Sequence, residues 1–145
     1  MGLDMYLRAR RYVSGWERIN TPEESNEWEH LVDFYDMRSF IPDGSPHAYV
    51  EFCVAYWRKA HSVHEWFVKN IQDGEDECES FLVEREQLEE LRTSCLRQLA
   101  DMEGVGEDDD NEEGWLFYQL KSTVTQIDKV LKLGSGWDFV YQSSW

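Results

Sequence analysis

The chain has 145 residues, of which 30 are acidic and 14 basic, and its formal net charge is -16. This length suits one domain with a buried core, and an aromatic fraction of 14% is too high for a disordered chain. The charge argues against direct binding to nucleic acid or to an anionic membrane, because like charges repel. We therefore predict a single folded domain over residues 1–145.

Neither a membrane segment nor a secretion signal is visible in the sequence. No stretch approaches the roughly 20 apolar residues that cross a bilayer, and the N-terminus lacks an apolar run of signal-peptide length. Cys53, Cys78 and Cys95 are odd in number and widely spaced, which argues against a disulfide framework or a zinc knuckle. We predict a cytoplasmic protein.

The two ends of the chain have the alternation that is typical of strands. Leu3, Met5 and Leu7 occupy alternate positions near the N-terminus, and Trp137, Phe139 and Tyr141 do so near the C-terminus. An isolated strand would leave its backbone donors and acceptors unmatched. We therefore expect the two terminal strands to pair in one small antiparallel sheet.

Four amphipathic helices are predicted between the terminal strands. Thr21 and Glu24 form a capping-box pattern that begins a helix ending near Arg38. A long central helix is expected over 45–71, a third over 88–102 and a fourth over 116–131, with a short extended piece at 81–83. The predicted fold class is α+β, in which these helices pack against the sheet.

An acidic segment separates the last two predicted helices. It carries eight acids and no base between Asp101 and Glu113, so self-repulsion and backbone entropy favour an exposed, mobile loop over about 103–113. Its carboxylates are candidates for contact with a basic partner: Asp108, Asp109, Asp110, Glu112 and Glu113.

Metal sites and common cofactor sites are not supported. His61 and His64 are three residues apart on a predicted helix, but no third ligand lies nearby in sequence, and a hydrogen-bonded His64 beside the core is the expected state. The acidic runs lack glycine at the sixth position of a calcium loop. Neither GxxxxGK[ST] nor GxGxxG occurs. We expect no metal and no cofactor.

A nucleophilic Cys78–His64 pair is the main catalytic possibility, since the two residues can meet across the turn at Asp73. The acidic neighbours of Cys78 disfavour a thiolate, which weakens this interpretation. A second hypothesis concerns the surface as a whole, because carboxylates along helices and loops can imitate the phosphates of duplex DNA and occupy a basic groove.

Five blocks of sequence resemble a family of small, uncharacterised phage and bacterial proteins that begin with MGLDMYL and end with YQSSW. The blocks here are residues 1–7, 55–60, 64–68, 70–74 and 141–145. The resemblance implies a phage-encoded cytoplasmic protein without an assigned activity. Within or close to these blocks lie the candidate pocket residues: Trp57, Arg58, His64, Asp73, Asp76, Cys78, Gln142 and Trp145.

Three functions remain open at this point. The first is a phage accessory protein that acts by binding, as an acidic DNA-mimic-like inhibitor of a basic host protein that handles nucleic acid or provides defence. The second is a small enzyme or ligand-binding domain with a pocket near His64, Asp73, Cys78 and Trp145. The third is a structural or assembly partner.

Overall fold

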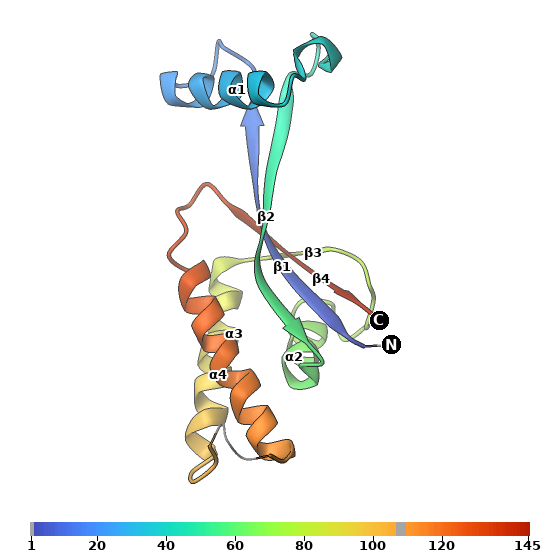
Figure 1. Ribbon diagram of the computed structural model, residues 1–145, viewed down its shortest axis with the longest axis vertical. Helices are drawn as coiled ribbons and strands as arrows, with labels where there is room; N and C mark the ends of the chain where they lie inside the picture. The colour runs from blue at the N-terminus through green and yellow to red at the C-terminus, as the bar shows by residue number, and fades with distance from the viewer. Residues whose placement is uncertain (1, 107–109) are drawn as a thin grey trace. The chain divides into compact units, whose positions relative to one another are not determined.

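The computed structural model describes residues 2–106 and 110–145 and has an α+β fold (Figure 1). The described strands form one antiparallel sheet in the order β2-β1-β4-β3. The N- and C-terminal strands are therefore neighbours within the sheet, as the alternation predicts. In chain order the elements are β1 (Asp4–Ser14), α1 (Pro22–Phe34), the 3₁₀ turn η1 (Arg38–Phe40), β2 (His47–Arg58), α2 (His61–Asn70), β3 (Phe81–Val83), α3 (Arg85–Asp101), α4 (Glu112–Val130) and β4 (Asp138–Ser144).

The chain divides into two compact units. The first, here called the sheet unit, comprises the residues up to Ala9 together with Phe52–Trp145, and the second, here called the α1 unit, comprises Arg10–Glu51. The strands β1 and β2 contribute residues to both. Each unit has its own hydrophobic cluster, so each is described by itself.

The sheet unit has one core, between its sheet and its helices. Leu3, Met5 and Leu7 of β1 are each at most 1% exposed, which confirms the buried face expected from their alternation. They share a cluster with Phe139 and Tyr141 of β4 and with apolar side chains of α2, α3 and α4. The helices α3 and α4 run side by side (Figure 1).

The long central helix expected over 45–71 is wrong. Residues 47–58 form the strand β2, and α2 begins only at His61. Aromatic and β-branched residues fill this segment and fit a pleated surface at least as well as a helix, and Ala55 and Trp57 are buried while Tyr56 between them is exposed. Lys59, which has a positive φ of 53°, separates the strand from the helix. The extended piece at 81–83 is confirmed as β3.

A row of polar side chains on α4 holds the end of β2. Gln119 Nε2 donates a hydrogen bond to the carbonyl of Lys59 at 3.1 Å, and Trp57 Nε1 donates to Thr123 Oγ1 at 2.9 Å. Further along the helix, Gln126 Oε1 accepts from the backbone nitrogen of Tyr56 at 2.9 Å. Because β2 is an edge strand, this last bond satisfies a backbone donor that would otherwise be open to another strand.

The acidic loop is shorter than predicted. Helix α4 begins at Glu112, and the side chain of Asn111 caps it by accepting from the nitrogen of Gly114 at 2.9 Å. Glu112 and Glu113 thus lie in the first helical turn, where the helix dipole stabilises negative charge. The predicted loop also includes residues 107–109, which lie outside the described part of the chain.

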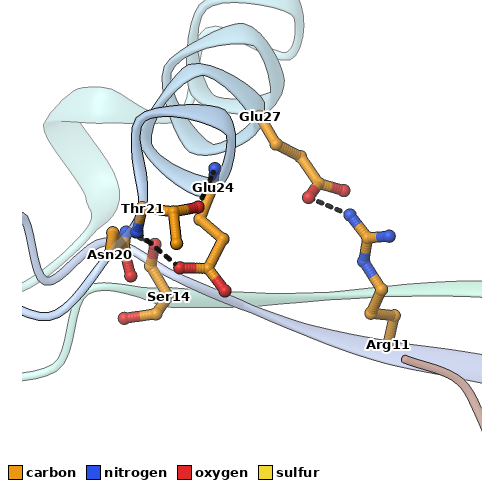
Figure 2. Close-up of polar contacts among 6 residues, drawn as sticks. All are labelled: Arg11, Ser14, Asn20, Thr21, Glu24 and Glu27. Carbon is orange, nitrogen blue, oxygen red and sulfur yellow. Dashed lines mark hydrogen bonds and ion pairs between the residues drawn. The ribbon is translucent and has the colours of Figure 1, made fainter. Parts of the chain in front are cut away.

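The α1 unit has a small core and is held by polar contacts at the start of α1. Val13, Trp28 and Val32 are its buried apolar residues. Figure 2 shows the capping box, in which Thr21 Oγ1 accepts from the nitrogen of Glu24 and the Glu24 carboxylate accepts from the nitrogen of Thr21. It also shows the ion pair of Arg11 with Glu27. The sequence correctly predicted the cap.

Within the described residues, no helix combines the length and the apolar character needed to cross a membrane.

We predict that Thr123→Val lowers the free energy of unfolding by about 1–3 kcal/mol, because Trp57 Nε1 would remain buried without an acceptor. Chemical denaturation followed by circular dichroism measures the change. Thr125→Val is the matched control: its hydroxyl also bonds to the backbone carbonyl four residues earlier, but Thr125 is exposed. Equal losses in the two variants would contradict the role assigned to Thr123.

Candidate functional site

His64, the residue at the centre of the predicted pocket, lies beside the core with both ring nitrogens hydrogen-bonded. Its Nδ1 is 2.7 Å from the hydroxyl of Tyr141, and its Nε2 is 3.0 Å from Oδ1 of Asp76. The ring of Trp145 packs edge-on against it, with the centroids 5.5 Å apart. The expectation of a hydrogen-bonded His64 beside the core is confirmed.

One tautomer of the imidazole, with its hydrogen on Nε2, is consistent with both hydrogen bonds. In this state His64 donates to the Asp76 carboxylate and accepts from the Tyr141 hydroxyl. The order carboxylate, imidazole, hydroxyl is that of a hydrolytic triad, with tyrosine in the place of the nucleophile. The resemblance is limited to connectivity, because a nucleophile must also meet its substrate.

Tyr141 does not reach solvent. It is 0% exposed, and its ring stacks on Phe67 of α2 with the centroids 3.8 Å apart. Burial, together with the negative charge of Asp76, raises the pKa of Tyr141 well above its ordinary value. A buried hydroxyl with a raised pKa is a poor nucleophile, so this cluster stabilises the packing of β4 against α2.

Gln142 and Cys78 belong to a different hydrogen-bonded group. Successive side chains of a strand point to opposite faces of its sheet, so Gln142 points away from the helix-covered face that its neighbour Tyr141 occupies. Gln142 Oε1 accepts from Arg8 at 2.9 Å, and its Nε2 donates to the carbonyl of Cys78 at 3.1 Å. The sheet thus separates Gln142 from the His64 cluster.

The remaining pocket candidates take no part in the hydrogen bonds that His64 forms. Trp57 is a core residue bonded to Thr123, Arg58 lies exposed at the end of β2, and Asp73 lies exposed in the turn after α2. Of the eight predicted residues, the structure therefore brings three together at His64, namely His64 itself, Asp76 and Trp145, and joins Gln142 to Cys78 separately.

No group of three or more histidine, cysteine, aspartate or glutamate side chains within the described ranges has a geometry that would hold a metal ion.

The predicted acidic contact residues are only partly described. Asp110, Glu112 and Glu113 are exposed, whereas Asp108 and Asp109 lie outside the described residues. The other two acidic stretches are divided between the units: residues 17–36 belong to the α1 unit and residues 73–90 to the sheet unit.

The α1 unit contains a groove that the sequence analysis did not identify. Its volume is about 820 Å³, within the range of ligand-binding clefts. Apolar side chains from the loop after β1, from α1 and from the loop before β2 line it, notably Trp16, Ile19, Trp28, Val32 and Ile41. Charged side chains of both signs complete the lining: Glu17, Asp43, Arg18 and Arg38.

Gly15 allows the groove's walls to approach each other closely. A Cβ atom at this position would lie 2.6 Å from Cε2 of Trp28 and 2.7 Å from Cβ of Pro46. Its backbone nitrogen donates to the carbonyl of Pro46 at 2.7 Å. Glycine is therefore required here by space, and any side chain would displace Trp28.

Large apolar side chains are exposed at unusual density in the α1 unit. Fifteen large hydrophobic residues are exposed in the described chain, and eight of them lie in this stretch of 42 residues. Exposed apolar groups in such concentration mark interaction surfaces. The eight are Tyr12, Trp16, Ile19, Phe34, Tyr35, Met37, Phe40 and Tyr49.

Carboxylates also outnumber cations in this unit. The α1 unit has nine acidic residues and four arginines. Arg11 pairs with Glu27, and Arg38 with both Glu29 and Asp33. Those two acids, hydrogen-bonded to the guanidinium, raise the pKa of Arg38. These ion pairs engage two of the four arginines, and the unit keeps an excess of carboxylates over arginines.

One signal in the sequence could have revealed the groove. Large apolar residues occur in loops, at Trp16 and Ile19 after a strand and at Ile41 before a turn, rather than on the inner face of a helix. Loops carry binding residues disproportionately often.

Comparison with protein-family models, with curated proteins and with solved structures found no match to this chain. The resemblance to phage and bacterial proteins stays a prediction.

We predict that the free energy of unfolding falls as the pH rises above about 10, the ordinary pKa of tyrosine. The folded-state pKa of Tyr141 is raised, so its contribution is complete below the unfolded pKa and is lost as the pH rises through the folded one. Tyr141→Phe should show a smaller alkaline loss than the wild type in urea denaturation at several pH values. Tyr118→Phe, at an exposed position, is the control and should follow the wild type.

The three thiols should separate into two reactivity classes. Cys53 and Cys78 are exposed, whereas Cys95 is buried and burial raises the pKa of its thiol from 9.0 to about 11. The thiolate is the reactive form, so a thiol reagent at neutral pH should modify Cys53 and Cys78 quickly and Cys95 only on unfolding. Rapid labelling of all three sites in mass spectrometry would contradict this burial.

Proposed function

We propose that this protein acts by binding a basic protein partner through the α1 unit. The observation that carries the proposal is the set of exposed apolar side chains in that unit, which also has an excess of carboxylates. Aromatic side chains are the usual energetic centres of protein interfaces. Carboxylates around them would attract a basic partner and orient its approach.

Exposure and position support this role for particular residues. Phe34 at the end of α1 and Phe40 in η1 are 71% and 74% exposed. Phe34 packs edge-on against Tyr35 with ring centroids 4.9 Å apart, which gives a preformed apolar contact. A partner that covered these rings would remove apolar surface from water, which stabilises a complex by roughly 25 cal/mol per Å² before the costs of association.

The His64 cluster supports an enzyme less well. His64 is 5% exposed and both of its ring nitrogens are bonded, and Tyr141 is 0% exposed. A substrate could not reach either group without displacing the packing of β4 on α2. Its hydrogen bonds are those of a polar group satisfied within a core.

A finer proposal concerns the kind of partner. Proteins that handle nucleic acid have contiguous basic surfaces, and a chain with a net charge of -16 could occupy such a surface in competition with DNA. The predicted phage origin would make the partner a host factor, for instance a defence nuclease. Competition with duplex DNA for the isolated partner tests this version.

The direct test is affinity capture with the purified protein from nuclease-treated bacterial lysate, followed by elution with rising salt. We expect a basic partner that elutes as salt screens the charges. In titrations of that partner, the double variant Phe34→Ser and Phe40→Ser should weaken binding at least about tenfold, as expected for central apolar contacts.

The matched control changes two exposed rings of the sheet unit, Trp115→Ser and Tyr118→Ser, which are 52% and 48% exposed. This variant should bind the partner like the wild type. Equal weakening by both double variants, or a partner whose binding ignores salt, would contradict the proposal.

A further inference from the structure

We infer that the groove of the α1 unit is a docking site for a basic peptide segment that carries a bulky apolar side chain. This inference rests on the proposed function and adds its molecular detail: the apolar side chain enters the groove, and neighbouring lysine or arginine residues of the peptide face the carboxylates along it. The occupant is a segment of the partner protein.

The interior of the groove fits an apolar group. Trp28 and Val32 project from α1, where they are 7% and 4% exposed and belong to the unit's core, so they form a fixed apolar floor. Trp16 and Ile19, in contrast, are 44% and 74% exposed and can cover an inserted side chain. The volume of about 820 Å³ accommodates an aromatic ring with some of its flanking backbone.

The walls of the groove are set before any partner binds. Gly15 lies against Trp28 and Pro46, and its backbone nitrogen bonds to the carbonyl of Pro46 at 2.7 Å. Asn20 Nδ2 donates to the carbonyl of Ser14 at 2.6 Å, which holds the loop that carries Trp16 and Ile19 (Figure 2). A preformed site loses less conformational entropy on binding.

The charges along the groove favour a basic occupant. Glu17 and Asp43 line it, and neither forms an ion pair or hydrogen bond with a described residue. The guanidinium of Arg38 is held by Glu29 and by Asp33, the latter at 2.8 Å. Arg18 and the paired Arg38 are the opposing charges in the lining, but nine carboxylates against four arginines in the unit make the surrounding potential negative.

The test selects peptides from a library of short random sequences on the intact protein. Enriched peptides should combine a bulky apolar residue with adjacent lysine or arginine. One selected peptide is then titrated in nuclear magnetic resonance experiments, where the indole N–H signals of Trp16 and Trp28 should shift before those of the sheet unit's tryptophans.

Two matched pairs of variants locate the site. Ile19→Ala and Leu82→Ala change aliphatic residues that are 74% and 66% exposed, but only Ile19 lines the groove. Asp43→Asn and Asp36→Asn likewise compare a lining carboxylate with an exposed one elsewhere in the unit. Ile19→Ala and Asp43→Asn should each weaken the selected peptide about tenfold or more, and their partners should leave its affinity unchanged.

Other outcomes overturn the inference in distinguishable ways. Basic peptides that bind Ile19→Ala as tightly as wild type would exclude the groove while leaving the proposed binding function intact. Enrichment of acidic peptides would point to Arg18 as the recognition group and would contradict both proposals. Absence of any enriched peptide would also reject the docking site. The capture experiment from lysate would still test the proposed function independently.

Discussion

The hydroxyl of Tyr141 must find a partner inside the protein, because β4 carries it into a core where water cannot reach it. His64 supplies that partner, and Asp76 in turn satisfies the second nitrogen of the imidazole. Leaving a buried polar group without a hydrogen bond destabilises the folded state by about as much free energy as the burial of several methylene groups contributes. This series of hydrogen bonds therefore holds β4, α2 and the segment after α2 together. The ring of Phe67 stacks on that of Tyr141 in the same place.

The two units use their aromatic residues differently. In the sheet unit, Trp57, Phe67 and Tyr141 are buried, and the polar atoms of Trp57 and Tyr141 are hydrogen-bonded. The α1 unit buries one aromatic ring, that of Trp28, and leaves many others exposed. Packing explains the buried aromatic residues of the sheet unit. The exposed aromatic residues of the α1 unit lower solubility and add nothing to a core. That contrast is the physical reason to place recognition in the α1 unit.

Prediction from sequence succeeded where a few neighbouring residues specify the local structure, and it failed where the same pattern of apolar residues fits both a helix and a strand. The capping box at Thr21 and the alternation of Leu3, Met5 and Leu7 each specify a local geometry, and both are present. The segment 47–58 has apolar residues at positions that suit either a helix face or a strand, and only its neighbour β1 and the polar row on α4 favour the strand. The groove escaped prediction because its lining comes from two loops and one helix.

The sequence by itself determined the α+β class, the neighbouring terminal strands and most helix positions, because capping residues and hydrophobic periodicity act within a few residues of the chain. It also placed His64 at a hydrogen-bonded position beside the core. Only the tertiary structure decided that Tyr141 and Asp76 are its partners, that Gln142 faces away from it, and that Trp16 and Ile19 meet Trp28 and Ile41 around one groove. Those facts depend on which distant segments pack together, and no local pattern encodes that choice.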